Sequence, residues 1–290
     1  MTDEQPPQSA FLHRLSQFAS VAAPTSVAAA LLFYFGYVAT YARYAYFGVD
    51  LTALDLSTIE VLLHGAEALY VPVAALVVLT LALHLIVQGI RRMLASRRRR
   101  RLVRIFAVAL VPLGVLLFAR GVVGVVWPEV SHTEFPGTTP ITLGFGLPLA
   151  AAGLRLRRAA LGRARRKGPS ETVVLTCLCL NVLLGLFWAT NSFASAYGRG
   201  IAHTVGNRIA KERPAVVIDT QEPLQLNLPG MQERLLPTAE GQKFRYRYRG
   251  LHVLTEAGGK LLLVTAERNG RSGTIVVPYD GSVRVAFIPN

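Results

Sequence analysis

Five long segments without a formal charge constrain this 290-residue chain more than any other feature. They cover residues 15–42, 68–90, 105–119, 135–154 and 172–198. Four of them reach the ~20 residues that a helix needs to cross ~30 Å of hydrocarbon, and the third does so by continuing past Arg120. We therefore predict five transmembrane helices, over about 22–42, 68–90, 105–126, 137–154 and 172–197.

A large water-soluble core is the alternative environment for such helices. Soluble helices carry a charged face, whereas residues 71–87 are apolar on all sides except for Thr80 and His84. A chain of 290 residues is also too short to enclose five such helices in one soluble core. The composition agrees, with 52% hydrophobic residues, 17% charged residues and a mean hydropathy of +0.39.

Basic residues cluster in two of the connections between these segments. Fifteen lysines and arginines lie in 91–104 and 155–167, against Arg43 alone in the other two connections, which hold six carboxylates. Lys and Arg are retained on the cytoplasmic side of short loops, so we place the basic loops inside. The anchors that we assign are Arg91, Arg92, Arg97, Arg98, Arg99, Arg100, Arg101, Arg155, Arg157, Arg158, Arg165 and Arg166.

This orientation puts a disordered tail, residues 1–14, in the cytoplasm and everything after the fifth span outside. The region from residue 199 onward holds thirteen basic and eight acidic residues, but long domains translocate largely regardless of charge. A net charge of +14 would ordinarily suggest nucleic acid as a partner. Because the basic clusters directly adjoin hydrocarbon spans, we expect anionic lipid headgroups instead, with lipid-specific or cytoplasmic-partner recognition as the alternative.

Charged and polar side chains near the spans are expected to join helices. Arg120, inside the third span, is predicted either to extend to the outer interface or to pair with Glu67 or Glu129. Asn181 should hydrogen-bond to a neighbouring helix. The outer loop 43–67 is predicted to form a short amphipathic helix on the membrane surface, capped by Asp55 or Ser57, serving as an elbow, a partner-docking surface or a lid.

The pattern changes to that of a small all-β domain over 214–290, after a linker at 199–213. Residues 243–249 read KFRYRYR, a period-two strand with the basic side chains on one face. Ala257-Gly258-Gly259 and Asp280-Gly281 predict two hairpins. Six or seven short strands are typical of a barrel or sandwich. Arg245, Arg247 and Arg249 form a candidate face for phosphate headgroups or an anionic envelope polymer, or else an ordinary solvated surface.

Motifs typical of enzymatic chemistry are absent from the sequence. The chain has no HExxH, GxSxG or phosphate-binding GxxxxGK[ST] pattern, and its six histidines are scattered. We therefore assign no catalytic residue, cofactor or metal ligand. The segments YFGVDLTALDLS at 46–57 and RYRYRGLHVLTEAGGKLLLV at 245–264 resemble uncharacterised multi-pass membrane proteins of high-GC actinobacteria. That resemblance implies a bacterial plasma membrane and supplies no activity.

These features together predict a five-span helical bundle followed by an extracytoplasmic β domain. The expected role is non-enzymatic binding, sensing or scaffolding of an envelope protein or polymer. The alternative is a channel or transporter component with an accessory β domain.

Overall fold

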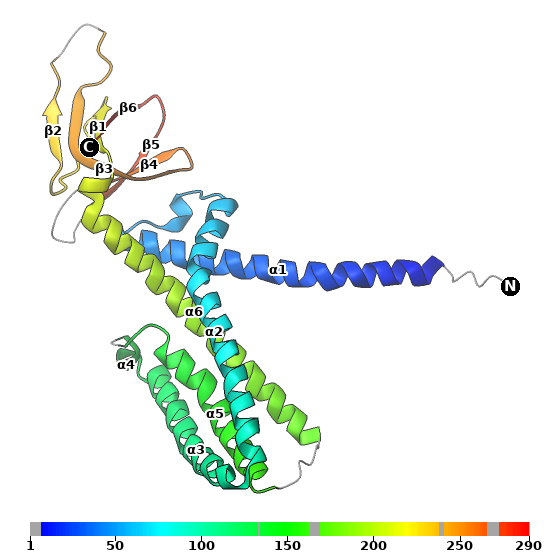
Figure 1. The fold of residues 1–290 in the computed structure, drawn as a ribbon. Helices are drawn as coiled ribbons and strands as arrows, with labels where there is room; N and C mark the ends of the chain where they lie inside the picture. The colour runs from blue at the N-terminus through cyan, green and yellow to red at the C-terminus, as the bar shows by residue number, and fades with distance from the viewer. Residues whose placement is uncertain (1–6, 133, 163–168, 238–240, 266–272, 290) are drawn as a thin grey trace. The chain divides into compact units, whose positions relative to one another are not determined.

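The computed structural model describes residues 7–132, 134–162, 169–237, 241–265 and 273–289. Its contacts divide the chain into two compact units, Met1–Glu67 with Ser195–Asn290, and Ala68–Ala194. The helices are α1 (Pro7–Tyr46), η1 (Leu51–Ala53), α2 (Thr58–Ala95), α3 (Arg97–Val126), α4 (Pro128–His132), α5 (Thr138–Ala160) and α6 (Pro169–Glu212) (Figure 1). The helix α1 begins at Pro7, within the tail that was expected to be disordered, and residues 1–6 lie outside the described part.

Four described helices are long and apolar enough to cross a membrane, rather than five. They are Pro24–Tyr46, Thr58–Ala95, Arg99–Val126 and Ser170–Glu212. The expected span that is not among them is the fourth, over 137–154, which corresponds to the 23-residue α5, rich in Gly, Thr and Pro. Those small residues include Gly144 and Gly146, which are buried against neighbouring helices. The sequence of α5 is therefore suited to close helix packing, at the expense of hydropathy.

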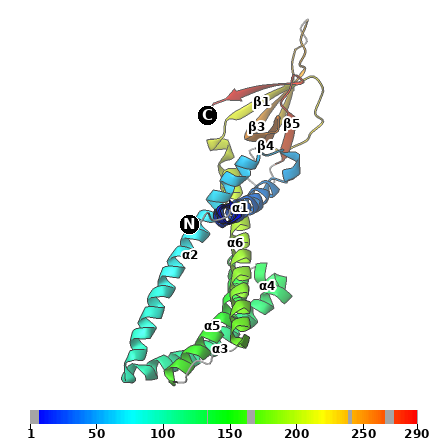
Figure 2. The ribbon, with the colours of Figure 1, turned by 90° about the vertical axis from the view of Figure 1, so that its right-hand side faces the viewer.

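Glycines bring α3 and α5 together as an antiparallel pair, which lies side by side in Figure 1 and overlaps in the view of Figure 2. A Cβ atom added at Gly146 would lie 2.5 Å from the backbone N of Phe118, and one at Gly153 would lie 2.9 Å from the carbonyl of Ala107. Such distances exclude any side chain larger than hydrogen. On the other side of α5, the Asn181 amide of α6 donates to the carbonyls of Leu143 and Gly144 at 3.1 and 2.9 Å, which confirms the predicted interhelical bond.

The outer loop does not form the predicted amphipathic helix. Asp50 caps the short helix η1 by accepting from the Thr52 amide at 2.9 Å, and residues 59–63 are already the first turns of α2. Ser57 is the cap of α2: it accepts from the Glu60 amide and its own amide donates to the Glu60 carboxylate, a capping box. Asp55, the other predicted cap, does not cap a helix. It adopts a left-handed φ of 43°, and its Oδ2 lies 3.8 Å from Lys260 Nζ.

The C-terminal region forms one antiparallel sheet of six strands. They are β1 (Ala215–Thr220), β2 (Gln232–Leu235), β3 (Tyr246–Ala257), β4 (Lys260–Thr265), β5 (Thr274–Pro278) and β6 (Val283–Ile288). Their order is β5-β4-β3-β1-β6, with β2 also paired to β3. The strand β3 joins two expected strands into one, and Gly258 and Gly259, with φ of +56° and +67°, make the predicted hairpin to β4.

The second predicted hairpin, at Asp280-Gly281, is wrong. It connects β5 and β6, which lie at opposite ends of the strand order. Four residues between Pro278 and Val283 span at most about 17 Å, whereas the two strands would lie about 19 Å apart in a flat sheet, so the sheet must curl. Among the described strands β5 and β6 do not pair, and the result is an open curled sheet rather than the expected closed barrel or sandwich.

Two hydrophobic cores explain why the sheet need not close. One lies on the strands of the sheet and contains Val216, Ile218, Tyr248, Leu251, Leu261, Leu263, Ile275 and Val277. The other joins β3 and β4 to the helix ends and the outer loop, through Tyr44, Phe47, Val49, Leu51, Leu54, Ala202, Ile209, Leu254, Ala257, Leu262 and Val264. The linker at 199–213, expected to be either helical or loose, is helical as far as Glu212. The sheet is therefore packed on helices and is not a tethered domain.

Candidate functional site

Of the strand predicted over 243–249, residues 246–249 belong to β3 and residues 243–245 precede it, and pairing with other strands brings further arginines beside Arg247. In antiparallel sheets, directly opposed residues point to the same face. Arg247 of β3 is opposite Arg234 of β2 and Asp219 of β1, and Asp219 is opposite Arg284 of β6. Four strands therefore place Arg234, Arg247, Asp219 and Arg284 in one row across the sheet. We call this row, together with Arg245 and Arg249, the arginine face.

Asp219 holds the centre of the arginine face. Its carboxylate accepts from Arg247 Nε at 2.7 Å and Nη2 at 3.0 Å, a bidentate pair, and from Arg284 Nε at 3.0 Å. The Asp219 side chain is only 4% exposed, whereas Arg247 and Arg284 are 29% and 57% exposed. The Arg247 hydrogen bond, supported by Arg284, lowers the pKa of the Asp219 carboxyl against the opposing effect of burial.

The remaining arginines of this face form no ion pair with a carboxylate among the described residues. Arg234, Arg245 and Arg249 are exposed, and Arg234 lies directly opposite Arg247, although like charges in that position destabilise a sheet. Side chains two residues apart on a strand are about 7 Å apart, and neighbouring strands about 4.8 Å. Five arginines thus face one carboxylate on a grid of that spacing. Beside them, Arg284 and Lys243 stack on the Phe244 ring at 5.3 and 5.8 Å.

Sequence reasoning missed three members of the arginine face. Arg234 and Arg284 lie in β2 and β6, whose pairing partners cannot be deduced from alternation alone. The sequence did contain an indication for Asp219, because it is the single charged residue in the apolar strand AVVIDT. A carboxylate buried in such a strand needs a cationic or hydrogen-bonding partner.

The predicted anchor arginines gather at one end of the α3–α5 pair. Arg99 to Arg101 lie in the first turns of α3, and Arg155, Arg157 and Arg158 lie at the end of the antiparallel α5. Arg91 and Arg92 end α2, just before α3 begins. The side chains of Arg97 and Arg98, and the whole of Arg165 and Arg166, lie outside the described residues.

Arg120 has a partner other than the predicted Glu67. Its guanidinium forms an ion pair with Glu134, from the connection between α4 and α5. Arg120 Nη1 and Glu134 Oε2 are buried without a hydrogen-bond partner among the described residues. Gly124 makes room for the pair, because a Cβ there would lie 3.0 Å from Arg120 Nη1. Glu134 lies between α4 and α5, fourteen residues after Arg120. The sequence alone did not indicate that this carboxylate, and not Glu67 or Glu129, would reach Arg120.

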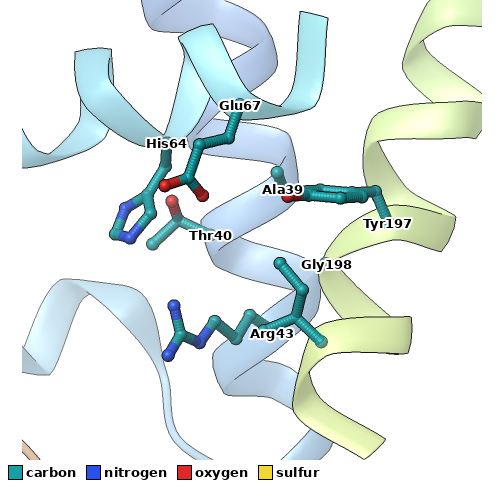
Figure 3. Close-up of a pocket in the computed structure, with 8 residues that line it drawn as sticks. Ala39, Thr40, Arg43, His64, Glu67, Tyr197 and Gly198 are labelled. Carbon is teal, nitrogen blue, oxygen red and sulfur yellow. The ribbon is translucent and has the colours of Figure 1, made fainter. Parts of the chain in front are cut away.

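Glu67 lies instead at the junction of α1, α2 and α6 (Figure 3). Figure 3 shows Glu67 and His64 of α2 facing Thr40 and Arg43 of α1. Thr40 Oγ1, Arg43 Nε and His64 Nδ1 are buried without a hydrogen-bond partner among the described residues. The cavity that these residues line measures about 10 Å³, which is room for roughly one water molecule.

No group of three His, Cys, Asp or Glu side chains that could hold a metal occurs in the described part of the chain. A groove of about 670 Å³ lies between β5 and the segment 220–228, with Leu224, Leu228 and Val277 on its walls. The sequence matches no protein-family model, no curated protein and no solved structure at a significant level.

Proposed function

We propose that this chain is an integral plasma-membrane protein that presents the curled sheet outside the cytoplasm and binds a phosphate-bearing polyanion on the arginine face. It carries out no covalent chemistry. The helices anchor the sheet, and the second hydrophobic core holds the sheet in a fixed orientation on the ends of α1 and α6.

Membrane insertion is supported by how the apolar helices are left exposed. In α2, the most apolar window has none of its residues buried inside the structure, and in α6 only 6% are buried. Exposed Leu, Val and Phe side chains on helices of this length are stable in hydrocarbon and unstable in water. The charge distribution supports the proposed orientation, because the α3–α5 pair has arginines at one end and Glu129 and Glu134 at the other.

The arginine face is the single observation that carries the binding proposal. Guanidinium groups present a planar fork of donors that matches phosphate oxygens, and they stay charged at every physiological pH. Asp219 fixes the orientation of Arg247 and Arg284 at the centre of the grid. The surrounding arginines are then free to contact successive phosphates of a chain, or the headgroups of a lipid surface, at spacings of about 5–7 Å.

The orientation is tested with a reporter enzyme that is active only outside the cytoplasm, fused after Asn290. Activity is expected. A reporter active only in the cytoplasm would overturn the assignment of sides.

Binding is tested on the full chain in detergent, because the sheet shares a core with the helices and has not been shown to fold alone. The probe is fluorescent inorganic polyphosphate, and in a second arm phosphatidylglycerol vesicles. Arg245→Gln with Arg249→Gln should weaken binding at least about tenfold. The matched control is Arg199→Gln with Arg208→Gln, two α6 arginines outside the arginine face. Equal binding by both variants would overturn the proposal, and the two arms distinguish a soluble polymer from a lipid surface.

A further inference from the structure

The α3–α5 packing places two arginine clusters that are more than fifty residues apart at the same end of one helix pair. Ala107 contacts Gly153, and Gly124 contacts Thr139 at the other end. One helical turn beyond the Ala107–Gly153 contact lie Val103, 2% exposed, on α3 and Arg157 on α5. The arginines on either side of these positions therefore share one end. We call them the helix-pair arginines: Arg99, Arg100, Arg101, Arg104, Arg155, Arg157 and Arg158.

These cations have little neutralisation from protein carboxylates. Six of the seven are exposed, and Arg155 is half-buried. Among the described side chains, the carboxylate that forms an ion pair with this set is Glu171, at 4.0 Å from Arg155. The Arg100 guanidinium donates to the Leu94 carbonyl at 2.7 Å, which fixes its direction without neutralising its charge. The cluster is therefore complementary to a ligand with more than one negative charge.

Apolar surface begins immediately beside the charges. Ile105 and Phe106 on α3 are 60% and 64% exposed, and Leu102 on α3 and Leu154 and Leu161 on α5 are also exposed. A ligand that contacts both the arginines and these side chains must have an anionic end and an apolar end. Free phosphate and nucleic acid have no apolar end of this kind, whereas a phospholipid has a phosphate headgroup joined to acyl chains.

We propose that the helix-pair arginines bind the headgroup of a phospholipid that carries two phosphates, with its acyl chains lying along the exposed apolar surfaces of α3 and α5. One phosphate is bound from α3 and the other from α5, because the two helices contribute separate sets of guanidinium groups. This inference rests on the proposed function only in requiring that these helices lie in a bilayer.

The test uses the full chain in nanodiscs of phosphatidylcholine containing a few per cent of either cardiolipin or phosphatidylglycerol at matched charge. Lipid retained on the protein is counted by native mass spectrometry. Cardiolipin should be retained in preference to phosphatidylglycerol, and Arg104→Gln with Arg157→Gln should weaken its binding roughly 30-fold. Arg199→Gln with Arg208→Gln removes the same charge elsewhere and should leave retention unchanged. Thermal unfolding of each variant checks that the helix pair remains folded.

Three results would overturn the lipid site. They are wild-type retention by the Arg104/Arg157 variant, equal retention of the two lipids, and displacement of cardiolipin by inorganic pyrophosphate at equal concentration. The variant Arg245→Gln with Arg249→Gln should not alter cardiolipin retention. The activity of the reporter fused after Asn290 does not depend on whether cardiolipin binds. Failure of the lipid site is thereby distinguishable from failure of the proposed function.

Discussion

Replacing Asp219 by Asn tests whether one buried carboxylate holds three strands of the curled sheet together. Asp219 accepts two hydrogen bonds from Arg247 of β3 and further bonds from Arg284 of β6, while its own strand, β1, lies between them. Asparagine keeps the size of the side chain but has one acceptor oxygen and no charge. The substitution therefore removes the electrostatic link and leaves the packing in place.

The size of the effect follows from the burial of the three groups. Removing one partner of a fully buried ion pair costs about 3–5 kcal/mol, because the other charge is left without a partner. Here the carboxylate is 4% exposed, but Arg247 and Arg284, at 29% and 57%, regain water when it is lost. We therefore expect a loss of about 2–3 kcal/mol in the free energy of local opening, below the fully buried range.

Hydrogen exchange of backbone amides measures this opening directly in the full chain. A loss of about 2–3 kcal/mol corresponds to roughly 30- to 150-fold faster exchange of the β1 and β6 amides. The matched control is Asp280→Asn, because Asp280 is an exposed carboxylate whose side-chain hydrogen bonds to described residues are local, to Ser282. Exchange in Asp219→Asn that matches the control would refute the reasoning. Combining Asp219→Asn with Arg247→Gln should cost less than the sum of the single changes, since both remove the same bond.

Three further predictions concern pH and helix packing. The pKa of Asp219 is lowered from its ordinary value of 3.8, so its contribution to stability is present above that value and should be lost as the pH falls through the lower folded pKa; acid unfolding of Asp219→Asn should lack this component. Gly198→Ala should separate α1 from α6 and lower the melting temperature, because the new Cβ would lie 2.0 Å from the carbonyl oxygen of Ala39. The control is Gly200→Ala, whose Cβ would have no atom within 4 Å and which should stabilise the protein by about 1 kcal/mol. Equal melting temperatures for the two variants would contradict this packing. Arg120→Gln and Glu134→Gln should each destabilise the second unit, and the double variant should recover about 1–2 kcal/mol of their sum, measured by a double-mutant cycle; additive effects would mean that the pair is not coupled.

Local features of the chain were predictable because they depend on residues close in sequence. Two adjacent glycines between strands require φ above zero at both positions, and the hairpin between β3 and β4 is found there. The alternation of RYRYR predicted one core face and one basic face, and Tyr248 is buried while Arg245 and Arg249 are exposed. The Ser57–Glu60 capping box is equally local.

Errors arose where the partner of a residue is distant in sequence. Asp280-Gly281 is typical of a hairpin, but β6 pairs with β1, more than sixty residues earlier, and this long-range pairing leaves no local signal in the sequence. The outer loop looked like a surface helix, yet Tyr44, Phe47, Leu51 and Leu54 pack against the sheet. An apolar side chain is expected to be shielded from water, but the sequence does not specify whether lipid or another segment of the chain covers it.

The amino-acid sequence by itself determined the long apolar helices, the position of the arginine clusters and the presence of a β region, since length, charge and periodicity are properties of short segments. Only the tertiary structure decided that Arg120 pairs with Glu134, that Asp219 joins Arg247 to Arg284, and that the clusters of α3 and α5 meet. These depend on strand register and on contacts between helix backbones. Strand register and helix contacts are determined by the packing of the whole chain. This packing buries charges only in pairs and leaves no room for side chains larger than hydrogen at the glycine contacts.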